Sequence, residues 1–306
     1  MHDLTNPWPP LDSSSWAPTR RSLHLYAQML GKLRLALSPH QPNFLFTALA
    51  LTPRGFTTGV IPYDGRAIQV SVDVFSVEMT VESSDGARRS IALSEPCTVA
   101  HVFSELHGAL AAAGVAVSLS PIPQEMADRT PLDVDLRPAV FDALDARRWH
   151  GALISIGGAL DRWRSHFAGR MGVYLWWGAL DLSLLLFSGE QIEAPRDRGY
   201  LLKYDLDAEM MSVGFYPGDD ASPAIFYGYI VPQPDGCEAL PILPAAATWS
   251  NQANEWILPY EAVRSSTNPE GMLASFLDSI YSACSYAAGW DRERFRYIAP
   301  PLRRAP

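Results

Sequence analysis

The sequence has little cysteine, lysine or histidine, and these shortages bear first on metal binding. Its three cysteines, Cys97, Cys237 and Cys284, lie far apart without a CxxC pair, which excludes a thiolate metal motif and favours a reducing compartment. The seven histidines complete no HExxH or comparable ligand spacing. Only Lys32 and Lys203 among the 24 basic side chains are lysines, which singles out both. We therefore expect no bound metal.

Motifs that bind cofactors are also missing. There is no GxGxxG after a predicted strand, no GxxxxGKS or GxxxxGKT loop and no GxSxG elbow, which removes the usual support for nucleotide, phosphate-loop and hydrolase functions. The net charge of -9 argues against nucleic acid and anionic membrane partners. The first residues lack the basic-then-apolar pattern of a leader, so we expect a cytoplasmic protein. Without a cofactor, any chemistry would depend on acid/base groups and fixed charges.

The composition and the sequence patterns predict a globular α+β protein, with antiparallel sheets flanked by helices. An apolar fraction of 48% with 19% charged residues is typical of a folded chain. Segments of period two separated by turn sequences predict strands, and stripes of period 3.6 predict helices. The predicted helices are 19–37, 98–113, 141–167 and 269–286, and the predicted strands are 44–52, 56–62, 68–75, 78–82, 90–93, 115–119, 210–216, 225–231 and 255–258.

The order of helix, strands and helix occurs twice along the chain, which suggests two similar halves. We expect an N-terminal arm over 1–18, a first α+β half over 19–120, a linker over 121–140 that is rich in proline and acids, and a second α+β half over 141–306. One continuous domain is the alternative, because no repeat is visible residue by residue.

The most apolar run of the chain, residues 173–189, contains a single acid, Asp181. The run predicts a long strand or a bent strand pair that is buried on both faces, with Gly178 as a bulge. An ionised carboxylate there would cost several kcal/mol, so Asp181 requires a cation, hydrogen-bond donors or a raised pKa. Acids of this kind are structural or functional, and the sequence leaves both readings open.

A polar arc on the first predicted helix offers cations to an anion. Arg21, His24, Gln28 and Lys32 share one side of this helix, and Arg34 lies close to them. Such an arc is either a solvated face or a set of donors for an anionic group. Asp73, on the polar face of the predicted strand 68–75, likewise faces either solvent or a cleft.

Three motifs lie on these elements. They are HxxxxxxGKxRL, with His24, Lys32 and Arg34, then RGxTT at Arg54–Thr58, and WGxxDL at Trp177–Leu182. Together with the segments GFYPG, ILPYEAVR and GWDRE, they make the chain resemble a widespread bacterial family that is known only as a domain of unknown function. The resemblance extends over nearly the whole chain, and it implies no activity, because none is established for the family.

The chain departs from that family where typical members carry histidines. Asn43–Phe46, Tyr174 and Ala208 align with histidines of the family pattern, and Glu209 follows the last of these positions. If those histidines bind a metal or transfer protons, this chain has lost that ability and has kept its acids and cations. The resemblance then implies a divergent member that acts on a specialised substrate, or a non-catalytic partner.

Two hypotheses about function follow. The first is a cofactor-free, metal-free enzyme, a lyase or cyclase of specialised metabolism, that acts on a small anionic metabolite by acid/base-assisted elimination or intramolecular cyclisation with loss of an anionic group. The second is a non-catalytic small-molecule-binding or partner-stabilising protein, in which Lys32 and Asp181 form a buried structural pair. On the first hypothesis the catalytic candidates are Asp181, Asp73, Glu209 and Lys32, and the substrate-binding candidates are His24, Arg34, Arg54, Tyr174 and Trp177. The many aromatic residues, with nine tryptophans, twelve tyrosines and twelve phenylalanines, further predict a homodimer or a heterodimer with a related chain.

Overall fold

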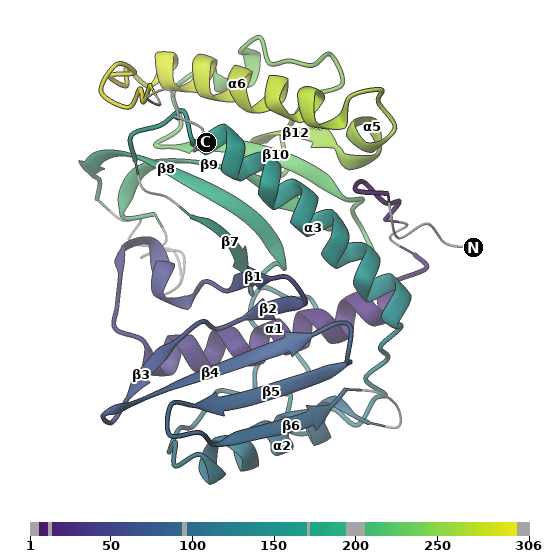
Figure 1. The fold of residues 1–306 in the computed structure, drawn as a ribbon. Coiled ribbons are helices and arrows are strands. Elements are labelled where there is room, and N and C mark those ends of the chain that lie inside the picture. The colour runs from purple at the N-terminus through teal and green to yellow at the C-terminus, as the bar shows by residue number, and fades with distance from the viewer. Residues whose placement is uncertain (1–5, 12–13, 94–96, 170–171, 194–205, 299–306) are drawn as a thin grey trace, which may run out of the picture. The chain divides into compact units, whose positions relative to one another are not determined.

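The computed structural model describes residues 6–11, 14–93, 97–169, 172–193 and 206–298, so Lys203 lies outside the described part. The chain forms two compact units. The first contains Met1–Ile154, Tyr174–Leu182 and Tyr216–Pro223, and the second contains Ser155–Val173, Ser183–Phe215 and Ala224–Pro306. Figure 1 labels the elements of both units.

An antiparallel sheet forms the centre of the first unit, with the strand order β1-β2-β4-β5-β6 and β3 paired to β4. The strands are β1 (Ala50–Thr52), β2 (Gly55–Thr57), β3 (Ile61–Tyr63), β4 (Arg66–Asp73), β5 (Glu78–Ser83) and β6 (Arg88–Ala92). In β4 the side chains of Ile68, Val70 and Val72 are at most 2% exposed, whereas the residues between them are half-buried. This alternation confirms the predicted period of two and turns one face of the sheet towards the core.

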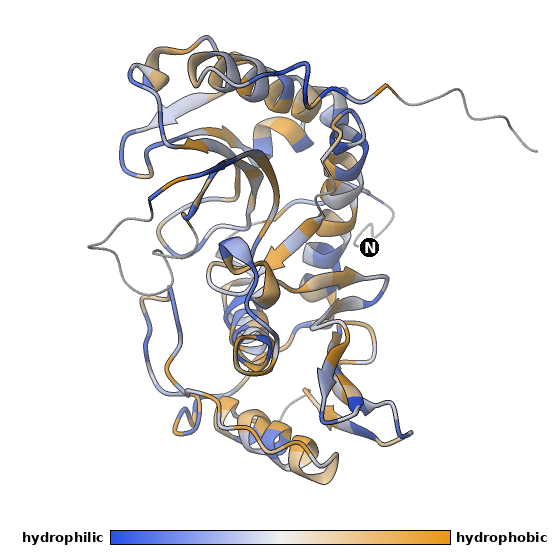
Figure 2. Ribbon diagram, turned by 90° about the vertical axis from the view of Figure 1, so that its left-hand side faces the viewer, coloured by the Kyte–Doolittle hydropathy of each residue, from blue (hydrophilic) through white to orange (hydrophobic). Residues whose placement is uncertain are grey.

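Two helices pack against this sheet, α1 (Ala17–Leu37) and α2 (Val99–Ala112). Both predictions of these helices are confirmed. A proline stands at the start of α1, where its missing N–H has no intrahelical partner to lose. The Thr98 side chain caps α2 by accepting a hydrogen bond from the His101 backbone N–H at 3.1 Å. Figure 2 shows α2 mostly in orange, as expected of a helix whose apolar stripe lies on a core.

The second sheet has the strand order β11-β12-β10-β9-β8-β7. Its strands are β7 (Val173–Trp176), β8 (Asp181–Gln191), β9 (Ala208–Tyr216), β10 (Ile225–Val231), β11 (Thr248–Ser250) and β12 (Glu255–Pro259). Two helices of the second unit, α5 (Tyr260–Arg264) and α6 (Pro269–Ala287), pack against β10, and Figure 1 shows α6 lying along this sheet. The remaining long helix is α3 (Ala143–Arg164), which confirms the third predicted helix.

Two predicted strands are wrong, and a third, 56–62, is divided into β2 and β3 by residues 58–60. In place of the first half of 44–52 the chain forms the 3-10 segment η1 (Pro42–Thr47), because Asn43 and Phe44 have positive φ values of 53° and 51° that no strand can contain. The Thr47 hydroxyl closes this turn by donating to the Phe44 carbonyl at 3.0 Å. Residues 115–119 also form no strand. The Val115 N–H instead ends α2 by donating to the Leu110 carbonyl at 2.9 Å.

The apolar run 173–189 is a strand pair rather than one long strand. β7 and β8 are neighbours in the sheet, and residues 177–180 form the turn between them. Gly178 therefore lies in this turn and not in a bulge within a strand, and Leu180 closes the turn with a φ of 61°. Asp181, the first residue of β8, is half-buried. The turn carries the WGxxDL motif, and its carbonyl oxygens contact side chains of α1.

Candidate functional site

One stripe of α1 lies against two non-helical segments of the first unit. The Nε2 atom of His24 lies 2.8 Å from the Gly178 carbonyl oxygen. One turn later, the Gln28 side-chain amide donates to the Trp177 carbonyl at 2.9 Å. After another turn, the Lys32 ammonium donates to the Ile122 carbonyl at 2.6 Å. The spacing of four residues places all three side chains on one face of the helix, which therefore holds the 177–178 turn and the segment around residue 122 in place.

Gln28 and His24 carry out this positioning without a net charge. The Gln28 amide oxygen accepts a hydrogen bond from the Gln124 N–H at 3.0 Å, and its NH2 group donates to the Gln124 carbonyl at 2.8 Å. Burial lowers the pKa of His24 to about 4, against the opposing effect of the Gly178 and Trp177 carbonyls. His24 is thus neutral at pH 7 and donates its Nε2–H to Gly178, so it positions the 177–178 turn.

The glycines of the GK and WG motifs are required by close packing. A Cβ atom at Gly31 would lie 2.0 Å from the Cγ atom of Trp177, whose side chain is only 4% exposed. A Cβ atom at Gly178 would lie 2.3 Å from the Oε2 atom of Glu125. The Lys32 ammonium lies 5.6 Å from the centroid of the Trp177 ring, within reach of a cation–π contact. The two motifs therefore form one packed unit around the indole of Trp177.

Glu125 is the acid that sequence reasoning missed. It lies in the segment 121–140, which has no periodicity and was expected to be a linker. Its carboxylate packs on Gly178 and its φ is 54°. The residue as a whole is exposed, but partial desolvation of its carboxylate raises its pKa above the ordinary value. In the part of the chain that the structure describes, this carboxylate has no hydrogen bond and no ion pair. A strained residue with a raised pKa at a packed motif is a candidate general base.

Two cations of the same region lack a carboxylate partner. Within the described ranges, Lys32 has only the Ile122 carbonyl and the Trp177 ring, and the exposed Arg129 forms no ion pair. Burial and the charge of Arg129 lower the pKa of Lys32 to about 8. Other arginines of the first unit pair with aspartates, and these pairs are Arg20–Asp220, Arg21–Asp135, Arg54–Asp73, Arg66–Asp85 and Arg137–Asp128. Lys32 and Arg129 thus carry positive charge that no described carboxylate neutralises.

The remaining substrate-binding candidates have structural contacts. Arg34 donates to the Phe46 carbonyl at 2.8 Å and to the carbonyl of Thr58, which anchors the RGxTT turn to α1. Burial lowers the pKa of Arg34, and the nearby Tyr174 opposes this shift. The half-buried Tyr174 has an edge contact with Trp176 at 6.1 Å between ring centroids. Tyr174 therefore lies near Arg34.

Asp73 and Arg54 are brought together by the structure, but as an ion pair at a hairpin. The Arg54 Nε donates to one oxygen of Asp73, and the other oxygen accepts from the N–H groups of Phe75 at 2.8 Å and Ser76 at 2.9 Å. Burial acts to raise the pKa of Asp73, but these donors outweigh it and hold the pKa below the ordinary value. Asp73 consequently stabilises the turn between β4 and β5 and is a weak base.

Asp181 lies at the start of β8, and Glu209 lies in β9. The charge of Asp181 contributes to raising the pKa of Tyr216, after the larger effects of burial and of Asp219, so Asp181 lies near that phenol. No ion pair joins Lys32 to Asp181 among the residues that the structure describes, so the structural pair of the second hypothesis is absent there. Glu209 is half-buried in β9 and belongs to the second unit, whereas the other candidates belong to the first.

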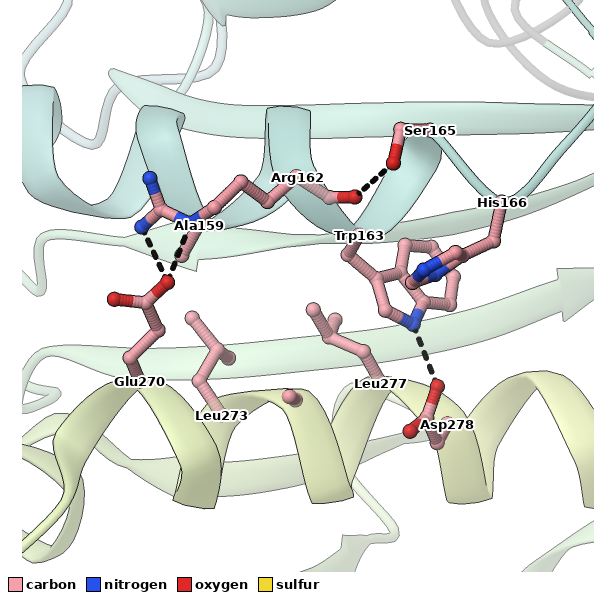
Figure 3. Close-up of a pocket in the computed structure, with 10 residues that line it drawn as sticks. Ala159, Arg162, Trp163, Ser165, His166, Glu270, Leu273, Leu277 and Asp278 are labelled. Atoms are coloured by element: carbon pink, nitrogen blue, oxygen red, sulfur yellow. Dashed lines mark hydrogen bonds and ion pairs between the residues drawn. The ribbon is translucent and has the colours of Figure 1, made fainter. Parts of the chain in front are cut away.

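A groove in the second unit lies between the end of α3 and the first turns of α6 and has a volume of about 350 Å³ (Figure 3). Arg162 forms an ion pair with Glu270, and the Trp163 indole N–H donates to Asp278 at 2.9 Å. The floor is made by apolar side chains that include Leu273 and Leu277. Because Arg162 is already paired with Glu270 and Asp278 adds a further carboxylate, we do not assign the anionic substrate to this groove.

The described residues contain no group of three or more His, Cys, Asp or Glu side chains placed to hold a metal ion. No described helix is both long and apolar enough to cross a bilayer.

Comparison with known proteins identifies the family of this chain. The model of the family of unknown function DUF5996 matches residues 8–297, which is nearly the whole chain. No curated protein and no solved structure matches the chain. The protein belongs to the family of unknown function DUF5996.

Proposed function

We propose that this chain is a cofactor-free, metal-free enzyme that acts on a small anionic molecule by acid/base-assisted elimination or intramolecular cyclisation with loss of an anionic group. Lys32 and Arg129 would bind the anionic group, and Glu125 would accept the proton. The observation that carries the proposal is the imbalance of charge on this side of the first unit. Two neighbouring cations lack a described carboxylate partner, and a carboxylate with a raised pKa lacks a described cation.

The imbalance favours an anionic ligand for an electrostatic reason. Lys32 is 4% exposed, and its only polar contact among the described residues is a carbonyl, so its buried ammonium is less stable than one in water. The charge of Arg129 destabilises it further, which is visible in its lowered pKa. An anion bound between the two cations would remove both penalties, as a carboxylate does for the paired arginines of this unit.

The reaction follows from these roles. Glu125 takes a proton from a carbon of the substrate, and the electron pair of that C–H bond forms a new π bond while the bond to the anionic group breaks. In the cyclisation, Glu125 takes the proton of an internal nucleophile, which forms a ring bond to the carbon that the anionic group leaves. The departing group carries away its electron pair, and Lys32 and Arg129 stabilise the negative charge that develops on it. Glu125 then returns its proton to water.

The protonation states of Glu125 and Lys32 set the pH dependence of this reaction. Glu125 accepts a proton only when it is ionised, which requires a pH above its raised pKa. Lys32 binds the anion only when it is charged, which requires a pH below about 8. The rate should therefore rise through the pKa of Glu125 and fall through about 8, in a bell-shaped profile.

A second candidate is a non-catalytic protein that binds a small molecule or stabilises a partner. This candidate is favoured by the contacts of His24 and Gln28, whose side chains donate to main-chain carbonyls. Such contacts make the region rigid and bind no ligand. On this candidate Lys32 and Arg129 would still bind an anion, but Glu125 would remove no proton.

Deuterium exchange distinguishes the two candidates. The protein would be incubated in D2O with a panel of small carboxylates and phosphate esters that carry an acidic C–H group or an internal nucleophile, and NMR would follow loss of the C–H signal and release of the anionic group. The enzyme hypothesis predicts exchange or release by the wild type, a slower reaction by Lys32→Met and none by Glu125→Gln. A reaction that persists in Glu125→Gln would remove this residue as the base. Anion binding without exchange or release anywhere in the panel would favour the second candidate.

We further infer that the protein is cytoplasmic and forms a homodimer, or a heterodimer with a related chain. Val134 and Leu136 support the association, because their side chains are 60% and 76% exposed on a segment of the first unit. Hydrophobic side chains exposed together in this way are typical of an interaction surface.

A further inference from the structure

The groove between α3 and α6 carries more negative than positive charge. Its volume of about 350 Å³ is within the range of sites that hold small molecules. Besides the titratable ring of His166, the lining contains one cation, Arg162, and two carboxylates, those of Glu270 and Asp278. All the lining residues belong to the second unit. The balance of charge therefore favours a cationic ligand over an anionic one.

The two carboxylates of the groove differ in their partners. Glu270 forms an ion pair with Arg162, which neutralises its charge. The Oδ1 atom of Asp278 accepts a hydrogen bond from the uncharged Trp163 indole N–H at 2.9 Å. Within the described ranges, the Asp278 carboxylate has no ion pair and no second hydrogen bond. Asp278 is exposed, and Figure 3 shows its carboxylate extending from α6 towards α3. Its Oδ2 atom and its charge are thus available to a ligand.

The surface between these two carboxylates is apolar. Glu270 and Asp278 lie on one face of α6, two turns and about 12 Å apart along its axis. Figure 3 shows the Arg162–Glu270 pair at one end of the groove and Asp278 towards the other. The apolar lining residues are Ala159, Leu273, Ala274 and Leu277. A hydrocarbon chain lying on them would leave water while a cation at its end meets Asp278.

We propose that this groove binds a small amphipathic cation, a primary ammonium that carries a hydrocarbon chain or ring of about six carbons. The ammonium donates to the Oδ2 atom of Asp278, and the hydrocarbon packs on the apolar lining. The Trp163 indole N–H holds the carboxylate in place, so Trp163 is a positioning residue. A cavity of about 150 Å³ holds benzene, so a groove of about 350 Å³ has room for this ligand. The site does not rest on the function proposed for Glu125 and Lys32.

Hexylammonium, hexan-1-ol and hexanoate test the proposal, because they share one chain and differ in the charge of the head group. Titrations at pH 7 followed by 1H-15N NMR of the indole N–H signals would give the affinities. We predict that hexylammonium binds about three- to tenfold more tightly than hexan-1-ol, as expected of one partly exposed contact between charges, and that hexanoate does not bind. Ethylammonium should bind about three- to tenfold more weakly than hexylammonium, because it buries less apolar surface. Hexylammonium should also shift the Trp163 signal, which is assigned by its loss in Trp163→Phe, because this indole shares Asp278 with the ligand.

Two variants with the same change of charge supply the controls. Asp278→Asn keeps an acceptor for the Trp163 indole and removes the charge, so it should bind hexylammonium and hexan-1-ol with nearly equal affinity. Asp235→Asn changes an exposed residue of the same unit that does not line the groove, and it should preserve the full preference for hexylammonium. No binding of hexylammonium, equal affinities for hexylammonium and either hexan-1-ol or ethylammonium in the wild type, or a preference that survives in Asp278→Asn would each overturn the proposal.

Discussion

Gly31→Ala tests the packing of α1 on Trp177, on which the position of Lys32 and of the WG turn depends. In an exposed helix this substitution stabilises a protein by about 0.5 to 1 kcal/mol, because alanine has the higher helix propensity. At position 31 the new methyl group would lie 2.0, 2.2 and 2.3 Å from three atoms of the indole. The ring cannot easily move, since Trp177 is 4% exposed and its carbonyl accepts a hydrogen bond from Gln28.

We therefore expect Gly31→Ala to destabilise the protein, although helix propensity alone predicts that it stabilises it. Overpacking a rigid core typically costs about 1 to 3 kcal/mol, and contacts this short belong at the upper end. After subtraction of the propensity gain, we expect Gly31→Ala to lower the free energy of unfolding by about 2 kcal/mol. Urea denaturation would measure it. Gly108→Ala is the matched control, because it lies within α2 and a Cβ atom there meets nothing within 4 Å.

A double-mutant cycle assigns the cost to the indole. In a Trp177→Leu background the space beside position 31 is larger, and Gly31→Ala should then destabilise by at least about 1 kcal/mol less than in the wild type. If Gly31→Ala stabilises the protein as Gly108→Ala does, or if its cost is unchanged in the Trp177→Leu background, the packing described here is incorrect.

Three further predictions concern stability and association. Glu125→Gln should raise the melting temperature near pH 7, because the raised pKa means that the folded state loses stability as pH rises from the ordinary value of 4.5 through the pKa of the folded protein. Thermal scans at several pH values would test this, and an unchanged or lowered melting temperature at pH 7 would contradict it. Asp135→Asn should cost about 2 to 3 kcal/mol, since the Asp135 carboxylate is 1% exposed and accepts from Arg137 at 2.7 and 2.8 Å. The pKa of Asp135 lies below the ordinary value of 3.8, so the stability that its carboxylate contributes is present above that pH and lost on acidification. Urea denaturation at pH 7 would test this, and equal stability of wild type and variant would refute the assignment. Leu136→Ser should weaken the proposed dimer in sedimentation experiments, whereas a wild type that is monomeric at micromolar concentration would remove the dimer from the account.

Much of the fold was predictable because it depends on local periodicity. The stripe of α1 and the alternation of β4 are visible in the sequence, since each side chain's burial follows from its position within one element. The turn at Asn43 and Phe44 was not, because left-handed backbone at a phenylalanine has no signal in composition. Val115 was misassigned for a related reason, because its N–H completes the end of α2 instead of pairing in a sheet.

The site was predictable only in part. The sequence places His24 and Lys32 on one face of a helix, but it does not show whether their partners are a ligand or main-chain carbonyls. Glu125 and Arg129 lie in an aperiodic segment, and only the structure brings that segment onto α1 and the WG turn. Contacts of this kind join residues about one hundred positions apart, which no local pattern encodes.

The pH dependence of anion binding tests the central claim, that Lys32 and Arg129 form an anion site. Calorimetric titration of sulfate would be carried out from pH about 6 to about 10 on the wild type, Lys32→Arg, Lys32→Met and the surface control Arg89→Met. We predict that the wild type loses affinity as pH rises through about 8, where Lys32 loses its proton, and that Arg89→Met behaves in the same way. Lys32→Arg should bind with little pH dependence, because its guanidinium stays charged, and Lys32→Met should bind weakly throughout. Sulfate binding that is independent of pH in the wild type and undiminished in Lys32→Met, or no binding at all, would contradict the account.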